Sequence, residues 1–363
     1  MLVAPRRHRT AGGPTVGTAT TNPPGLDPQR LRAHLDAERP GLVCGDLRAT
    51  LITGGRSNLT YDVTDGHRHW VVRRPPLGHV LPTAHDMSRE HRVVTALAPT
   101  PVPVPGTVLY CDDPEVIGAS FYVMERVVGT PYREADRLAR LGPRRTRNIA
   151  HAMIDTLVDL HAVDPAAVGL GDFGRPDGFV ERQLRRWARQ LDSSRSRELP
   201  GIDELHSRLA AALPASPPPT IVHGDYRLDN LLIGAGDGAG PDDRITAVLD
   251  WEMSTLGDPF TDLALLIAYS SPAIPPVPGV SDAHTAPGYP GPDEIAERYA
   301  RCSGRDVSGL DFYVAFAYFK LAVILEGIHY RFARGQTVGD DFDRLGEAVP
   351  RLVEAGLRSL GAD

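Results

Sequence analysis

Three polar residues, Asp225, Asn230 and Asp250, stand at a spacing that suits chemistry on a phosphate group. A carboxylate on a loop can accept the proton of an attacking hydroxyl while the hydroxyl oxygen bonds to phosphorus. Amide and carboxylate oxygens are hard ligands of the kind that Mg²⁺ prefers. The spacing therefore predicts phosphoryl transfer to an alcohol, with Asp225 as the base and with Asn230 and Asp250 as metal ligands.

His223 stands two residues before Asp225 and leaves two interpretations open. As a metal ligand beside Asp225 and Asp250, it would indicate a metal-dependent hydrolase. As a packed residue, it would fix the loop through hydrogen bonds. The sequence contains no G-x-G-x-x-G, P-loop, G-x-S-x-G or H-E-x-x-H motif. A dinucleotide cofactor, a P-loop NTPase, an esterase and a zinc protease are therefore disfavoured.

The elements around these residues change type along the chain. Strand patterns occur over residues 47–53, 59–64, 69–73, 107–111 and 120–125, with a helix pattern over 83–97. After residue 128 the pattern is helical, except for a hairpin over residues 231–249. This order predicts an α+β, bilobal protein-kinase-like fold with a small antiparallel β-rich N-lobe and a larger, mostly helical C-lobe.

We expect three segments within this fold. Residues 1–25 are predicted to be a flexible tail, because they have few apolar groups to bury. Residues 26–127 are predicted to form the N-terminal nucleotide-binding lobe. Residues 128–363 are predicted to form the C-terminal catalytic and acceptor-binding lobe.

A nucleotide site is predicted under the β-rich lobe. Glycines after the first strand would let backbone amides approach phosphates, although a hairpin turn without a ligand is the alternative. Arg73 ends the third strand where a phosphate-binding cation is expected, and Glu90 on the next helix is its expected partner in catalysis; both could instead be solvated surface charges. The last strand runs into the interlobe linker, where backbone groups can bind an adenine edge. The expected nucleotide contacts are Gly55, Arg56, Ser57, Asn58, Arg73, Met124, Glu125 and Arg126.

The acceptor alcohol is expected in the helical lobe, next to the base. A long predicted helix over residues 310–333 carries several polar residues, and the alternative is that they form the polar face of a core helix. The expected acceptor contacts are Asp225, Glu252, Glu326, His329 and Arg331.

Composition limits the partners. The formal net charge of −7 argues against sequence-independent nucleic-acid binding, which requires a basic face. Three widely spaced cysteines indicate a reducing compartment. We find neither a secretory signal nor a window of 18 apolar residues, so a cytoplasmic protein without a membrane partner is expected, as a monomer or homodimer.

The motifs over residues 223–230, 248–252 and 257–264 resemble those of the aminoglycoside phosphotransferase and choline kinase superfamily, which has a protein-kinase-like fold. Residues 71–76, 115–125 and 319–328 resemble its branch related to kinase domains fused to acyl-CoA dehydrogenases. The resemblance implies Asp225 as catalytic base, Asn230 and Asp250 as Mg²⁺ ligands, and a nucleotide under the small lobe.

Residues and resemblance together predict an ATP- and Mg²⁺-dependent small-molecule kinase that transfers the γ-phosphate to a hydroxyl. The expected acceptor is an antibiotic, such as an aminoglycoside, nucleoside or macrolide, or a hydroxy acid or hydroxyacyl thioester. The alternatives are a catalytically inactive nucleotide-binding pseudokinase and the metal-dependent hydrolase.

Overall fold

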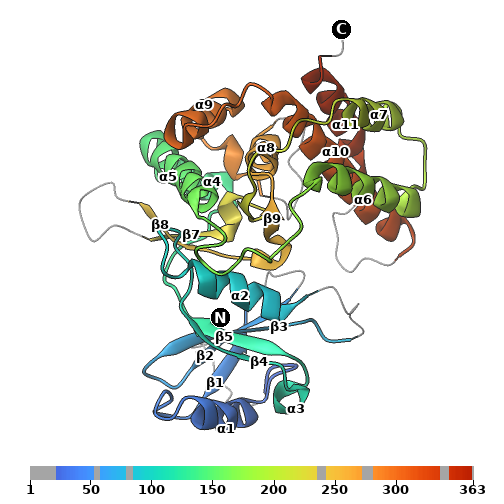
Figure 1. The fold of residues 1–363 in the computed structure, drawn as a ribbon. Helices are drawn as coiled ribbons and strands as arrows, with labels where there is room; N and C mark the ends of the chain where they lie inside the picture. The colour runs from blue at the N-terminus through green and yellow to red at the C-terminus, as the bar shows by residue number, and fades with distance from the viewer. Residues whose placement is uncertain are drawn as a thin grey trace, which may run out of the picture.

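The computed structural model describes residues 22–52, 58–78, 85–234, 243–271, 281–335 and 343–361. They form a β-rich lobe and a larger helical lobe, which lie against each other in Figure 1. The predicted α+β, bilobal architecture is therefore confirmed. The predicted lobe boundaries at residues 26, 127 and 128 stay predictions.

The β-rich lobe contains one antiparallel sheet of five strands in the order β1-β2-β3-β5-β4. Its second and third strands pair in register over their whole length, across the turn at Asp65 and Gly66. The Asp65 carboxylate accepts the backbone amides of His67 and Arg68, which fixes this turn. The strands are β1 (Arg48–Leu51), β2 (Leu59–Thr64), β3 (His69–Arg74), β4 (Thr107–Cys111) and β5 (Phe121–Glu125).

Strand alternation decides which helix each side chain of β3 meets. Trp70 and Val72 are buried in the cluster that includes apolar residues of α1 (Pro28–Glu38). Val71 points to the other face, in the cluster beside α2 (Met87–Leu97). Because successive side chains alternate, Arg73 shares the α2 face with Val71. Along the chain, the short helix α3 (Pro114–Ile117) follows β4 and precedes β5.

The helical lobe is built around α10, which is contacted by α6, α8 and α11. By length and composition, α10 is long and apolar enough to span a membrane, which the sequence did not lead us to expect, but 67 % of its apolar window is buried inside the protein. That burial is typical of a core helix. The helices of this lobe are α4 (Ala135–Ala139), α5 (Pro143–Ala162), α6 (Phe179–Ser194), α7 (Ile202–Ala211), α8 (Phe260–Tyr269), α9 (Pro292–Ser303), α10 (Leu310–Ala333) and α11 (Ala348–Ser359).

Two short strand pairs lie where the lobes meet and carry the polar motif. β6 (Thr220–Val222) pairs with β9 (Thr255–Gly257), and β7 (Leu231–Gly234) pairs with β8 (Arg244–Val248). The loop that contains Asp225 therefore begins where β6 ends and finishes where β7 begins. Asp250 follows the end of β8, so the two pairs bring both parts of the motif together.

The interlobe linker crosses β7 and β8 at Gly129. The next residue, Thr130, forms a β-bridge with Ile233, and the hydroxyl of Thr246 donates to the carbonyl of Val128 at 3.1 Å. A Cβ atom on Gly129 would lie 2.7 Å from Cβ of Leu232. This position therefore requires glycine because of a close approach of backbones.

We expect Gly129→Ala to lower the free energy of unfolding by about 1–3 kcal/mol, because the added methyl group overpacks the contact between linker and hairpin. Denaturant titration measures the change. Gly309→Ala is the matched control, since no heavy atom lies within 4 Å of a Cβ built at Gly309. Equal stability of the two variants would contradict this account of the crossing.

Candidate active site

The loop that begins at His223 is held by a buried carboxylate. Asp262, in the first turn of α8, is 1 % exposed and accepts the backbone amides of His223 at 2.6 Å and Gly224 at 2.8 Å. Burial acts to raise the pKa of Asp262, but interactions with His161 and His223 outweigh it and lower the pKa. An ionised Asp262 therefore fixes the backbone immediately before Asp225.

His223 uses both ring nitrogens inside the protein. Its Nε2 atom lies 2.9 Å from the carbonyl of Leu249 and so donates to it, while Nδ1 accepts the amide of Asp225 at 3.3 Å. The described residues contain no group of three or more His, Cys, Asp or Glu side chains that could hold a metal ion. The arrangement supports the packed, loop-fixing role of His223 and gives no support to the hydrolase alternative.

Asp225 and Asn230 are joined directly. The side-chain nitrogen of Asn230 donates to the backbone carbonyl of Asp225 at 2.9 Å and to Oδ2 of Asp225 at 3.2 Å. The amide of Leu249 donates to the backbone carbonyl of Asn230 at 2.8 Å, which links this loop to the segment before Asp250. Since the side-chain nitrogen of Asn230 is engaged, its side-chain oxygen is the atom suited to a metal ion.

Asp250 adopts the left-handed backbone conformation, with φ of 66° and ψ of 60°. Residues other than glycine rarely take this conformation, although aspartate and asparagine are enriched among those that do. The conformation turns the chain from β8 into a short 3₁₀ helix, and the Asp250 carboxylate pairs with Arg73. The donor set of one carboxylate and one amide oxygen fits Mg²⁺ that is shared with phosphate oxygens.

Arg73 pairs with Glu90 of its own lobe and reaches two carboxylates of the helical lobe. Its guanidinium pairs with Asp250, lies 3.1 Å from Glu90 and lies 3.9 Å from Glu252. Burial acts to lower the pKa of Arg73, but Glu90 and Asp250 outweigh it and raise the pKa. Burial raises the pKa of Glu90 to about 7 although Arg73 opposes this shift. The structure thus brings the predicted Arg73–Glu90 pair together.

The structure modifies the predicted nucleotide contacts. Gly55, Arg56 and Ser57 lie outside the described residues. Asn58 is buried and bonds within the protein: its amide nitrogen donates to Glu252 at 3.0 Å, and its side-chain oxygen lies 2.7 Å from Nδ1 of His85.

Two of the backbone amides at the end of β5, where the adenine edge is predicted to bind, have partners within the protein. The amide of Glu125 donates to the carbonyl of Gly106 at 2.7 Å, and that of Arg126 to the carbonyl of His69 at 3.3 Å. The side chain of Met124 is buried in the cluster with Met87 and Tyr122. The nucleotide contacts predicted at Met124, Glu125 and Arg126 stay predictions.

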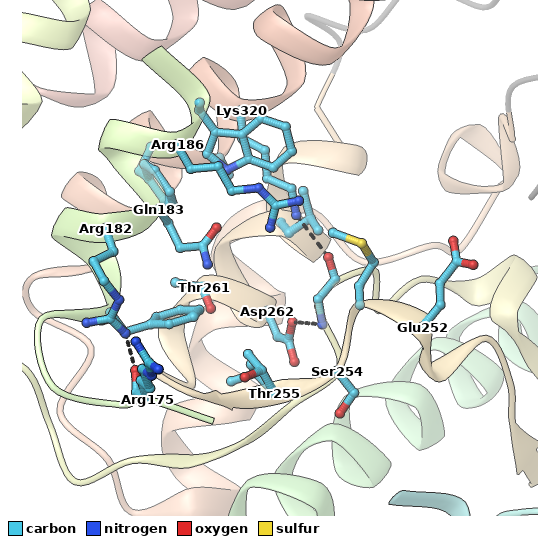
Figure 2. Close-up of a pocket in the computed structure, with 18 of the residues that line it drawn as sticks. Arg175, Arg182, Gln183, Arg186, Glu252, Ser254, Thr255, Thr261, Asp262 and Lys320 are labelled. Atoms are coloured by element: carbon cyan, nitrogen blue, oxygen red, sulfur yellow. Dashed lines mark hydrogen bonds between the residues drawn. The ribbon is translucent and has the colours of Figure 1, made fainter. Parts of the chain in front are cut away.

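A cavity of about 610 Å³ opens beside Gly224, the residue before the candidate base (Figure 2). Of the five residues predicted from the sequence to contact the acceptor, only Glu252 lines this cavity. Lys320 of α10 donates to the carbonyl of Gly224 at 2.9 Å. Burial lowers the pKa of Lys320, although the carboxylates of Asp225 and Asp262 oppose this shift. The cationic side chains that line the cavity are Arg89, Arg175, Arg182, Arg186 and Lys320.

The structure does not bring the other predicted residues of α10 to this cavity. Glu326 is 0 % exposed and pairs with Arg197 at 2.8 Å, whereas Arg331 is exposed, and neither residue lines the cavity. Nδ1 of His329 is buried without a hydrogen-bond partner among the described residues, and His329 does not line the cavity either. Lys320 lies six residues before Glu326, or about 9 Å along the helix, and reaches the site instead.

Residues 48–297 match the phosphotransferase enzyme family designated APH, which is more than half of the chain. The chain belongs to this family. Acyl-CoA dehydrogenase family member 11 of Gallus gallus is 35 % identical over 325 residues, which are 88 % of this chain and 41 % of that relative. The chain therefore spans less than half the length of this relative.

Solved structures show the same fold. A candidate aminoglycoside phosphotransferase from Ralstonia eutropha is 32 % identical with a TM-score of 0.78, over 92 % of this chain and 98 % of that one. A thermostable mutant of aminoglycoside phosphotransferase APH(4)-Ia, solved with AMP-PNP and hygromycin B, has a TM-score of 0.58 at 16 % identity, over 92 % and 99 % of the two chains. The predicted superfamily is confirmed.

The raised pKa of Glu90 predicts a pH dependence of stability. Glu90 releases its proton near pH 4.5 in the unfolded chain and near pH 7 in the folded protein. Between these values the folded state binds more protons, so this contribution to the free energy of unfolding falls as pH rises. We expect the stability of the native protein, relative to Glu90→Gln, to decline from pH 4.5 to pH 7.

Denaturant titration of both proteins across this range tests the prediction. The exposed Glu115 offers the matched substitution, Glu115→Gln. A stability difference between native protein and Glu90→Gln that does not change with pH would show that Arg73 keeps Glu90 ionised throughout.

Proposed function

We propose that this protein is an ATP- and Mg²⁺-dependent O-phosphotransferase that transfers the γ-phosphate to the hydroxyl of a small molecule. One observation carries the proposal: separate segments converge to place Asp225, Asn230 and Asp250 at one site, with Arg73 of the β-rich lobe paired to Asp250. The complex of APH(4)-Ia with AMP-PNP supports the use of ATP by this fold.

In this proposal each group has one task. Asp225 accepts the proton of the acceptor hydroxyl as its oxygen attacks the γ-phosphorus and ADP leaves. Arg73 grips phosphate oxygens, held from behind by Glu90. Asn230 and Asp250 hold Mg²⁺, which when bound would neutralise charge on the phosphates. Asp225, Asn230 and Asp250 are all present, so nothing at the site favours the pseudokinase alternative.

We further propose that the acceptor is an anion. The three acidic residues that line the cavity have bonds within the protein: Asp86 caps α2, Asp262 holds two amides, and Glu252 accepts from Asn58. Four arginines and Lys320 outnumber these three carboxylates, and Figure 2 shows Arg175, Arg182, Arg186 and Lys320 around the cavity. A positive potential of this kind repels a polycationic aminoglycoside and attracts a carboxylate or phosphate.

Among the acceptors expected from the sequence, a hydroxy acid or hydroxyacyl thioester therefore fits best. The relative's name, which places it among the acyl-CoA dehydrogenases, supports the thioester, since coenzyme A carries several phosphate charges. Cytoplasmic location and a monomeric or homodimeric state stay predictions.

We expect Asp225→Ala to lower kcat by about 10²–10⁴-fold, the usual contribution of a positioned general base. Binding of the Mg²⁺-nucleotide should change little, because Asp225 is not an expected metal ligand. Coupled ATP-consumption assays give kcat, and calorimetric titration gives nucleotide affinity. Asp250→Ala is the comparison, since it should weaken Mg²⁺-dependent nucleotide binding as well. Native rates in Asp225→Ala would refute the role of the base.

We expect Arg186→Ala to raise KM for an anionic acceptor by about 10-fold, the loss expected for one charge-assisted contact. The KM for ATP should not change. Arg185→Ala is the matched control on the same helix, because Arg185 is exposed, pairs with Glu181 and does not line the cavity. The measurement is ATP consumption with hydroxy acids, their coenzyme A thioesters and aminoglycosides as acceptors. Preferential turnover of aminoglycosides would overturn the anionic assignment.

A further inference from the structure

Tyr269, the last residue of α8, touches the candidate base. Its hydroxyl donates to Oδ1 of Asp225 at 3.0 Å, while Asn230 donates to Oδ2 of the same carboxylate at 3.2 Å. Each carboxylate oxygen therefore accepts a bond from a different element. We propose that Tyr269 is a positioning residue that fixes the rotation of the Asp225 carboxylate toward the acceptor hydroxyl; the inference rests on the proposed phosphoryl transfer.

The two ends of α8 hold consecutive parts of the same loop. Asp262 in the first turn holds the backbone of His223 and Gly224, and Tyr269 in the last turn holds the side chain of Asp225. Residues seven apart lie on the same side of a helix. One rigid helix of ten residues thus sets both where the loop runs and how its carboxylate is turned.

The ring of Tyr269 is itself held in place. The guanidinium of Arg227 lies 5.0 Å from the ring centroid, and Arg227 pairs with the buried carboxylate of Asp229. A hydroxyl carried by a fixed ring loses little entropy when it bonds to Asp225, so the bond can select one carboxylate orientation.

The Tyr269 hydroxyl donates a hydrogen bond to Asp225 but does not accept the proton of the acceptor hydroxyl. Burial is the largest cause that raises the pKa of Tyr269, and the charge of Asp225 raises it further. The phenol therefore stays protonated. The acceptor proton then passes to Asp225, the new P–O bond forms and the bond to ADP breaks, while the Tyr269 hydrogen bond persists.

The test is Tyr269→Phe, which removes the hydroxyl and keeps the ring. We expect kcat to fall about 10-fold, as for loss of one hydrogen bond to a charged group, with the KM values for ATP and acceptor unchanged. The assay uses the alcohol found by the acceptor screen, or the slow hydrolysis of ATP, with water as acceptor, where no alcohol is turned over.

The matched control is Tyr289→Phe. Tyr289 lines the same small cavity as Tyr269, but its hydroxyl bonds to Ser270 and not to Asp225. It should leave kcat unchanged. A fall in kcat in both variants to the same extent would reveal general damage to this region and would overturn the proposal, as would a native kcat in Tyr269→Phe or a rise in KM alone.

A crystal structure of Tyr269→Phe separates this proposal from the proposed function. We expect the Asp225 carboxylate to rotate or to occupy two orientations, while the bonds from Gly224 and His223 to Asp262 persist. An unchanged single orientation overturns the positioning role even if the native protein is active. If the native protein transfers phosphate to nothing, the proposed function fails, and the orientation of this carboxylate still decides the role of Tyr269.

Discussion

The site depends on one buried carboxylate that accepts two consecutive backbone amides. An ionised Asp262 inside the protein is costly unless its oxygens are saturated with donors, and the amides of His223 and Gly224 supply them. The interaction works in both directions, because those amides would otherwise be buried without acceptors. Once it forms, α8 and the end of β6 are fixed to each other, and the positions of Asp225, Asn230 and the His223 ring follow from local geometry.

The polar contacts between the lobes form a second constraint. Arg73 reaches from the β-rich lobe to Asp250, and Asn58 reaches to Glu252, so the lobes are joined at the residues expected to bind phosphate and metal. A guanidinium that moves from Asp250 to a phosphate keeps an anionic partner, and Asp250 gains a cation in exchange. In the proposed function, nucleotide and metal would therefore replace the contact between Arg73 and Asp250 with little uncompensated charge.

Much of this arrangement was predictable from sequence because it depends on local rules. The turn at Asp65 and Gly66, the alternation of β3 and the spacing from Asp225 to Asn230 each have a short-range signal. Long-range partners have no such signal, and nothing near Lys320 in the sequence indicates that it reaches Gly224. Glu326 is a charged residue on an apolar helix, a pattern that also fits a site residue, but it pairs with Arg197. The bond from the amide of Glu125 to the carbonyl of Gly106 is likewise long-range and has no local signal.

The choice of the proposed acceptor would depend on such long-range contacts and not on the motif. The whole chain carries a net charge of −7, yet arginines from α6 and Lys320 from α10 line the cavity that opens beside Gly224. An averaged charge cannot describe one cavity, because screening confines each charge to its own neighbourhood. In the proposed phosphoryl transfer, the motif supplies a chemistry open to any alcohol, and the side chains that α6 and α10 present to the cavity would decide which alcohol binds.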